Sequence, residues 1–168
     1  MPQTALSNDS EQQFYDLRHG FRVGGFALLL QQHTHSELIP CGQVCRIPET
    51  PDWFVGFINH RGEAVPVYDL ARSLSQKEEK TRQRWLLLLD RQPDTAALLL
   101  YSTPQSITDP QQLEQEKCIA IPDELKRFCS GQYHYQDMLW LEFDHRAFFA
   151  TQKAAFNKDN STIKTTGN

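Results

Sequence analysis

The 168-residue sequence has no excess of basic charge and no long apolar run. Its 17 lysines and arginines are outnumbered by 21 aspartates and glutamates, which gives a formal net charge of −4. Such a chain offers no broad positive field for phosphates, so neither nucleic acid nor an anionic membrane surface is expected as a partner. No stretch reaches the length needed to cross a bilayer, and the first residues, MPQTALSNDSEQQ, lack the basic start and apolar core of a signal peptide. We therefore expect a cytoplasmic protein without direct membrane insertion.

The sequence also lacks the common motifs of catalysis and nucleotide binding. It contains no Gly-x-Ser-x-Gly, no Gly-x4-Gly-Lys-Ser/Thr and no Gly-x-Gly-x-x-Gly. Asp69 and Asp144 could form a carboxylate pair, but each follows an apolar run and precedes a helical segment, where aspartate typically caps the first turn. We therefore expect no enzymatic activity and no cofactor.

Cysteine is scarce, and in the cytoplasm the four thiols are expected to stay reduced: Cys41, Cys45, Cys118 and Cys129. The first two lie near His33 and His35, which would share one strand face, so a zinc site can be considered. A structural zinc site normally combines two Cys-x2–4-Cys units, and the later two cysteines are too far apart in sequence to form one. We expect no metal. As an alternative function for the whole protein, we keep the binding of a small ligand or a metal by a β-barrel.

Short apolar runs separated by turn residues are what the sequence does contain. They predict three hairpins: residues 21–30 around Gly24-Gly25, residues 84–102 with Pro93-Asp94 in the turn, and residues 53–70 with the turn at residues 59–62. Pro66 cannot donate to a strand ladder, which places it at a sheet edge, a strand start or a bulge. Helix is expected only in short segments, at residues 71–74, 109–116, 123–128 and 144–149. Many short strands indicate a barrel or a sandwich.

A shift of 75 positions aligns two parts of the chain. Gly56 then falls on Gly131, and Asp69 falls on Asp144. The identities are few, so coincidence is the alternative explanation. We interpret the pattern as a duplication that yields two related β halves, each too small to be stable alone.

The segment GFINHRGEAVPVYDL, residues 56–70, resembles the pattern Gly-x-x-Asn-x-Arg-Gly-x-x-x-Pro-x-x-Asp-Leu of CheW-like domains. The residues in register are Gly56, Asn59, Arg61, Gly62, Pro66, Asp69 and Leu70. Upstream, Glu37-Leu38 and residues 46–48 (Arg-Ile-Pro) occupy further family positions. Residues 128–149, FCSGQYHYQDMLWLEFDHRAFF, are similar to the closing segment of the PilI-type variant from systems that govern type IV pili and twitching motility.

This resemblance implies a mainly β fold: two five-stranded SH3-like β-barrels related by a pseudo-twofold axis, with a few short helices. The domain would span residues 14–152, between flexible tails at residues 1–13 and 153–168. The function implied is a non-catalytic adaptor that couples the tips of methyl-accepting chemoreceptors to the regulatory domain of a CheA-type histidine kinase.

The resemblance also implies which residues make protein contacts: Glu37, Leu38, Gly56, Asn59, His60, Arg61 and Gly62. Structural roles are expected for Pro66, Asp69 and Leu70. The chain departs from the family by having His60 in place of an aliphatic residue, His-Ser-Glu-Leu at residues 35–38 in place of Val-x-Glu-Val, and a more polar segment at residues 28–35. At a hairpin tip Arg61 could be an ordinary solvated charge, but guanidinium is also a common interface anchor.

Overall fold

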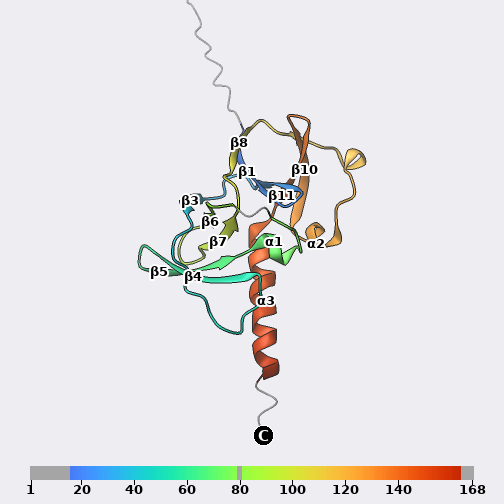
Figure 1. Ribbon diagram of the computed structural model, residues 1–168. Helices are drawn as coiled ribbons and strands as arrows, with labels where there is room; N and C mark the ends of the chain where they lie inside the picture. Colours follow the sequence, from blue (N-terminus) through green and yellow to red (C-terminus); the bar gives the residue numbers. More distant parts are fainter. Residues whose placement is uncertain (1–15, 79–80, 164–168) are drawn as a thin grey trace, which may run out of the picture.

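The structure is a computed structural model that describes residues 16–78 and 81–163, and it is built mainly of β-strands (Figure 1). In these residues, one sheet has the strand order β8-β1-β2-β11-β10-β9 and the other has the order β3-β6-β7-β5-β4. The mainly β prediction is confirmed, and the first sheet exceeds five strands because the two-residue strand β9 joins its edge. The strands are β1 (Leu17–Val23), β2 (Phe26–Leu30), β3 (Ser36–Pro40), β4 (Phe54–His60), β5 (Glu63–Tyr68), β6 (Trp85–Leu89), β7 (Ala96–Leu100), β8 (Gln105–Thr108), β9 (Gln111–Gln112), β10 (Cys129–Tyr135) and β11 (Met138–Phe143).

The three predicted hairpins are present as β1–β2, β4–β5 and β6–β7. The two halves of the sequence exchange the first hairpin of each half. β5 pairs in parallel with β7, where Val67 lies opposite Ala97, and β11 pairs in parallel with β2, where Leu141 lies opposite Leu28. The five-stranded sheet therefore contains the hairpin of the second half, and the six-stranded sheet contains the hairpin of the first. Each sheet needs strands from both halves of the chain.

Equivalent hairpins confirm the duplication. β4–β5 and β10–β11 each carry a β-bulge, just before Gly56 and just before Gly131. Each hairpin ends in a two-residue turn with positive φ at both positions: 54° and 86° at Arg61-Gly62, and 48° and 57° at Gln136-Asp137. The two turns are also 75 positions apart, so the repeat extends to backbone conformation.

The aspartates that follow these hairpins are equivalent too. The backbone N–H of Asp69 donates to the carbonyl of Trp53 (2.7 Å), and that of Asp144 donates to the carbonyl of Phe128 (2.8 Å). Each Oδ1 accepts a hydrogen bond from the backbone N–H three residues later, at 3.1 Å and 2.9 Å. Both predicted helix caps are therefore confirmed.

The largest hydrophobic cluster joins the two sheets. It contains Leu28 and Phe143 from the six-stranded sheet, Leu98 from the five-stranded sheet and Phe148 from the last helix, each with at most 2% of its surface exposed. One continuous core is what two small β halves need in order to bury enough apolar surface.

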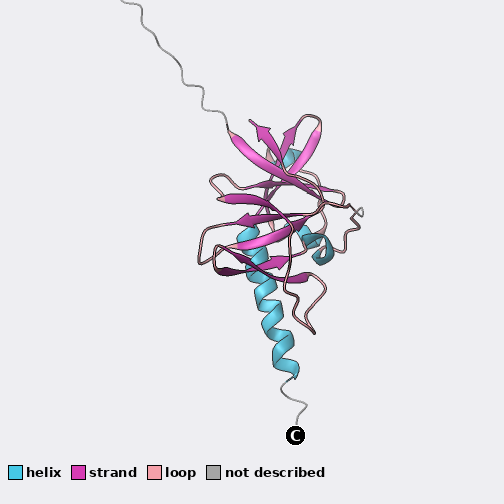
Figure 2. Cartoon of the chain, turned by 60° about the vertical axis from the view of Figure 1, so that its left-hand side comes forward, coloured by secondary structure: helices cyan, strands magenta, loops and turns pink. Residues whose placement is uncertain are grey.

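The helices differ from prediction in two places. α1 (Leu70–Ser73) and α2 (Asp123–Lys126) form where short helices were expected. The helix predicted for residues 109–116 is instead β9 followed by the 3-10 helix η1 (Gln115–Lys117), because residues 111–112 pair with β10. The final helix, α3 (His145–Ile163), is 19 residues long and extends beyond the sheets (Figures 1 and 2).

The expected flexible tail at residues 153–168 is therefore wrong for residues 153–163, which belong to α3. Phe149 and Phe156 lie two helical turns apart on one face, and the rings of Phe156 and Phe54 pack with centroids 5.4 Å apart. This contact explains why the helix continues. The expected tail at residues 1–13 and the segment 164–168 lie outside the described residues.

An ion-pair cluster fixes the first turn of α3 to the β6–β7 turn. Asp90 receives two hydrogen bonds from the Arg146 guanidinium (3.0 and 2.8 Å) and one from His145 Nε2 (2.9 Å), and His145 is 1% exposed. Burial alone would raise the pKa of Asp90, but the hydrogen bonds from Arg146 and His145 outweigh burial and lower this pKa below its ordinary value of 3.8.

The duplication provides a matched pair of glycine substitutions. A Cβ at Gly56, where φ is +135°, would lie 2.2 Å from the carbonyl oxygen of Cys45, whereas at Gly131 the nearest atom is in the Tyr133 side chain at 3.2 Å. Gly56→Ala should lower the free energy of unfolding by about 2–4 kcal/mol, from strain and overpacking. Gly131→Ala should cost about 1 kcal/mol or less. Equal losses in urea denaturation would show that the Cys45 contact does not constrain the bulge.

The Asp90 cluster predicts a pH-dependent contribution to stability. Because the folded-state pKa of Asp90 is lowered, its stabilisation is present above about pH 4 and is lost as the pH falls through that pKa. At pH 7, Asp90→Asn should lower the free energy of unfolding by about 1–3 kcal/mol, and this difference should shrink toward pH 2. Asp94→Asn, an exposed change in the same turn, is the control. A pH-independent loss in denaturant titrations would contradict the electrostatic account.

Candidate interaction surface

The β4–β5 turn presents most of the residues expected to make contacts. Asn59 Oδ1 accepts a hydrogen bond from the Gly62 backbone N–H (3.1 Å), and His60 lies opposite Glu63 in the hairpin. The turn is thus tighter than the four residues expected, because its central residues are Arg61 and Gly62 alone. Positive φ at both central residues is what a type I′ hairpin turn requires. Asn59 and Gly62 shape the tip that carries Arg61.

Glu37 joins this tip from β3, which lies at the opposite edge of the five-stranded sheet. Its Oε1 lies 3.1 Å from Arg61 Nη2, and its Oε2 lies 3.3 Å from His60 Nε2. Closure of the barrel thus places Glu37 of the edge strand β3 beside the tip of the β4–β5 hairpin. Three of the expected contact residues therefore form one group, which we call the tip cluster: Glu37, His60 and Arg61.

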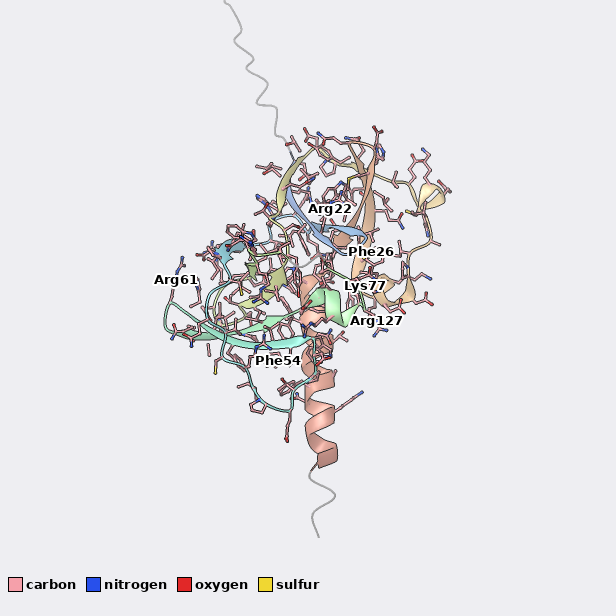
Figure 3. The ribbon with its side chains drawn as sticks, in the orientation of Figure 1. Arg22, Phe26, Phe54, Arg61, Lys77 and Arg127 are labelled. Atoms are coloured by element: carbon pink, nitrogen blue, oxygen red, sulfur yellow. The ribbon has the colours of Figure 1, made fainter. Side chains whose placement is uncertain are left out.

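The side chains of the tip cluster are exposed to different degrees. The Arg61 side chain is 75% exposed, the Glu37 side chain 32% and the His60 side chain 17%. Figure 3 shows Arg61 at the far end of the hairpin, away from the body of the molecule. An ion pair this exposed contributes about 0–1 kcal/mol to stability, so folding does not depend on Arg61.

Leu38 and Gly56 do not join the tip cluster. Leu38 is 38% exposed but follows Glu37 in β3, so its side chain points to the other face of the strand. Gly56 is buried against the backbone of Cys45 and Arg46. The contact expected at Gly56 stays a prediction; what the structure gives this glycine is a place where two backbones approach closely.

Pro66 lies in an inner strand, but at a point where it needs no hydrogen-bond donor. It lies opposite Phe57, whose N–H and C=O both bond to Cys45 on the far side (2.9 and 2.8 Å). The parallel pairing of β5 with β7 includes only Val67 and Tyr68. Pro66 is therefore at neither a sheet edge nor a strand start, and the sheet tolerates it because no partner faces its nitrogen on either side.

Asp69 and Leu70 have the structural roles expected of them. Asp69 is 1% exposed; besides capping α1, its Oδ2 accepts a hydrogen bond from the Tyr101 hydroxyl (2.8 Å). Burial and this bond raise the pKa of Tyr101 to about 12. Leu70 is fully buried in the core that joins the sheets.

Two neighbouring hollows lie at the tip cluster and beside it. One, of about 440 Å³, includes the tip cluster itself, with Leu88 and the start of the β6–β7 turn. The other, of about 1040 Å³, lies between the five-stranded sheet and α3, and its lining includes Phe54, Phe57 and Phe156. Sequence reasoning missed the second hollow because it ended the last helix too early. The spacing of Phe149 and Phe156 was the signal for the longer helix.

The sites considered for metal and thiol chemistry remain dispersed. Within residues 16–78 and 81–163, no group of three or more His, Cys, Asp or Glu side chains is placed to hold a metal ion. The four cysteines are free, and burial raises the pKa of Cys129 to about 11. None of the described helices combines the length and the apolar character that a transmembrane helix needs.

Comparisons with known proteins agree with this architecture. The sequence model of the CheW-like domain family matches residues 19–153. Protein FrzA of Myxococcus xanthus is 34% identical over 90 residues, which cover 52% of this chain and 54% of FrzA, so the match spans about half of that relative. The crystal structure of the scaffolding protein TtCheW from Thermoanaerobacter tengcongensis superposes with a TM-score of 0.60 and 20% identity, over 76% of this chain and 87% of that chain. That likeness shows a shared fold, and the family match covers most of the sequence. The chain belongs to the family of CheW-like domains.

Proposed function

We propose that this protein is a non-catalytic adaptor of a bacterial chemosensory system, which couples methyl-accepting chemoreceptors to the regulatory domain of a CheA-type histidine kinase in the cytoplasm. The observation that carries the proposal is the tip cluster: an exposed arginine at the end of a hairpin, paired with Glu37 at 3.1 Å. The family membership supports it, as does the name of TtCheW, which describes that protein as scaffolding.

The backbone at Arg61 supports a role for its side chain. With φ of 54°, Arg61 adopts a conformation that Gly, Asn and Asp adopt more readily. Arginine there costs about 1 kcal/mol relative to those residues, and its exposed ion pair returns about 0–1 kcal/mol. Local stability therefore gives no reason for arginine at this position. A guanidinium that binds a partner carboxylate does.

The output that we propose is the control of type IV pili and twitching motility. Its support is the resemblance of residues 128–149 to the PilI-type variant of the family. The receptor contact would include the exposed Leu38, which lies on the other face of β3 from Glu37.

Arg61→Glu is the direct test of the kinase contact. We expect the variant to unfold like the parent, because an exposed turn charge contributes within about ±0.5 kcal/mol. Its affinity for the regulatory domain of the CheA-type kinase from the same organism should fall by roughly 30-fold or more, since an interface anchor is removed and its charge reversed. Thermal melts and calorimetric titrations measure the two effects.

The second barrel supplies the matched control. Gln136 occupies the equivalent turn position, with φ of 48°, so Gln136→Glu introduces the same side chain on the same backbone and should bind like the parent. The charge swap Glu37→Arg with Arg61→Glu separates two possible roles of Arg61: a direct contact with the kinase, and an action through its pairing with Glu37. If the swap restores affinity, Arg61 acts only through Glu37 and the proposed contact with the kinase is wrong.

Gly62→Val tests the turn rather than the surface. The backbone φ at Gly62 is +86°, and a Cβ there would meet open space, so any loss comes from backbone strain alone. We expect the free energy of unfolding to fall by about 1–3 kcal/mol. Binding should weaken only in proportion to the unfolded fraction measured in the same melt. A large loss of affinity in fully folded Gly62→Val would place a partner against the glycine itself.

A further inference from the structure

The larger hollow has an apolar floor and two walls of different origin. The floor includes Phe54 and Phe57 of β4, whose ring centroids lie 5.3 Å apart. One wall is the β6–β7 turn at residues 90–95, and the other is the face of α3 that carries Phe149 and Phe156. Figure 3 shows Phe54 next to α3. Phe57, Phe149 and Phe156 remain half-buried, so this apolar strip is not fully covered by the chain's own residues.

Cationic side chains stand on both walls. Arg91 lies on the β6–β7 turn and Lys153 on α3; both are exposed, and neither has an ion-pair or hydrogen-bond partner within the part of the chain that the structure describes. Arg146 is also 73% exposed, although it pairs with Asp90. Asp94 is the remaining acid in the lining. The lining thus carries three cationic side chains and two carboxylates, and the cationic excess lies on the α3 wall, which holds Arg146 and Lys153. On the turn, Arg91 stands between Asp90 and Asp94.

From this arrangement we propose that the hollow docks an acidic amphipathic helix of a partner protein. An apolar strip beside the basic α3 wall, with Arg91 across from it, complements a helix with apolar residues at positions i, i+3/i+4 and i+7 and carboxylates beside them. The volume of about 1040 Å³ lies at the upper end of the usual range of ligand sites. His35, Asp90, Arg91 and Gln92 line both this hollow and that of the tip cluster, so the two surfaces are continuous.

This docking site goes beyond the proposed function. Phe156 and Asn157 line it, and both lie after residue 153, where the match to the family model ends. The wall that α3 provides is therefore completed by residues outside the matched domain. The proposal stands on the hollow and its charges, and it does not require the tip cluster to bind a kinase.

The test is selection from a displayed library of random peptides of about 16 residues, long enough for four helical turns, on the full-length protein. Enriched peptides should carry several Asp or Glu residues beside an apolar stripe of helical spacing. Their binding, measured by fluorescence anisotropy of synthetic copies, should weaken as salt is raised. The double variant Arg91→Glu with Lys153→Glu should reduce affinity at least tenfold. Lys77→Glu, an exposed lysine outside the hollow, should bind like the parent.

Three outcomes would overturn the proposal: no enrichment, enrichment of basic or uncharged peptides, or full affinity in the double variant. A thermal melt of each variant keeps loss of fold apart from loss of binding. Arg61→Glu distinguishes this site from the tip cluster. If that variant abolishes peptide binding while Arg91→Glu with Lys153→Glu does not, the peptides bind the tip cluster and the hollow is not their site.

Discussion

The structure depends on the exchange of hairpins between the two halves of the chain. The parallel pairings β5–β7 and β2–β11 insert each half's first hairpin into the other half's sheet. Because every sheet combines strands from both halves of the chain, neither half can form a barrel by itself. The core that joins the two sheets buries residues from both of them. Two units that would each be marginal in size therefore fold as one.

The exchange also supports the base of the hairpin that carries the tip cluster. β5 pairs with β4 along its length and with β7 at Val67 and Tyr68, so the base of the β4–β5 hairpin is held within the sheet. The bulge at Gly56 brings β4 against the backbone of Cys45, and Glu37 contacts Arg61 at the tip. An adaptor has no chemistry to perform, so a fixed surface is what its structure must supply. A contact side chain on such a support loses little entropy when a partner binds.

Local patterns in the sequence were sufficient for much of the fold. Glycine and proline turns located three hairpins, and the aspartates at 69 and 144 located two helix starts. The shift of 75 positions aligned Gly56 with Gly131, and the structure adds that each follows a bulge. The exchange of hairpins was not predictable in this way, because a hairpin has the same local pattern whichever sheet it joins. The contact of Glu37 with Arg61 joins residues 24 positions apart and follows from barrel closure.

The length of α3 was missed because the end of the sequence is polar on average. A single aromatic residue, Phe156, supplies the contact with Phe54 that holds this part of the helix against the sheet. This one aromatic contact stabilises the helix in a segment whose other residues are mostly polar. The larger hollow could not be anticipated for the same reason, since its second wall exists only if the helix continues.

The measurement that tests the adaptor account most directly is hydrogen–deuterium exchange of the full-length protein, with and without the regulatory domain of its CheA-type kinase. The account predicts that binding slows exchange in the β4–β5 hairpin and in β3, the two segments that form the tip cluster, while the β10–β11 hairpin exchanges as before. Unchanged exchange throughout, or protection confined to the β10–β11 hairpin, would contradict it.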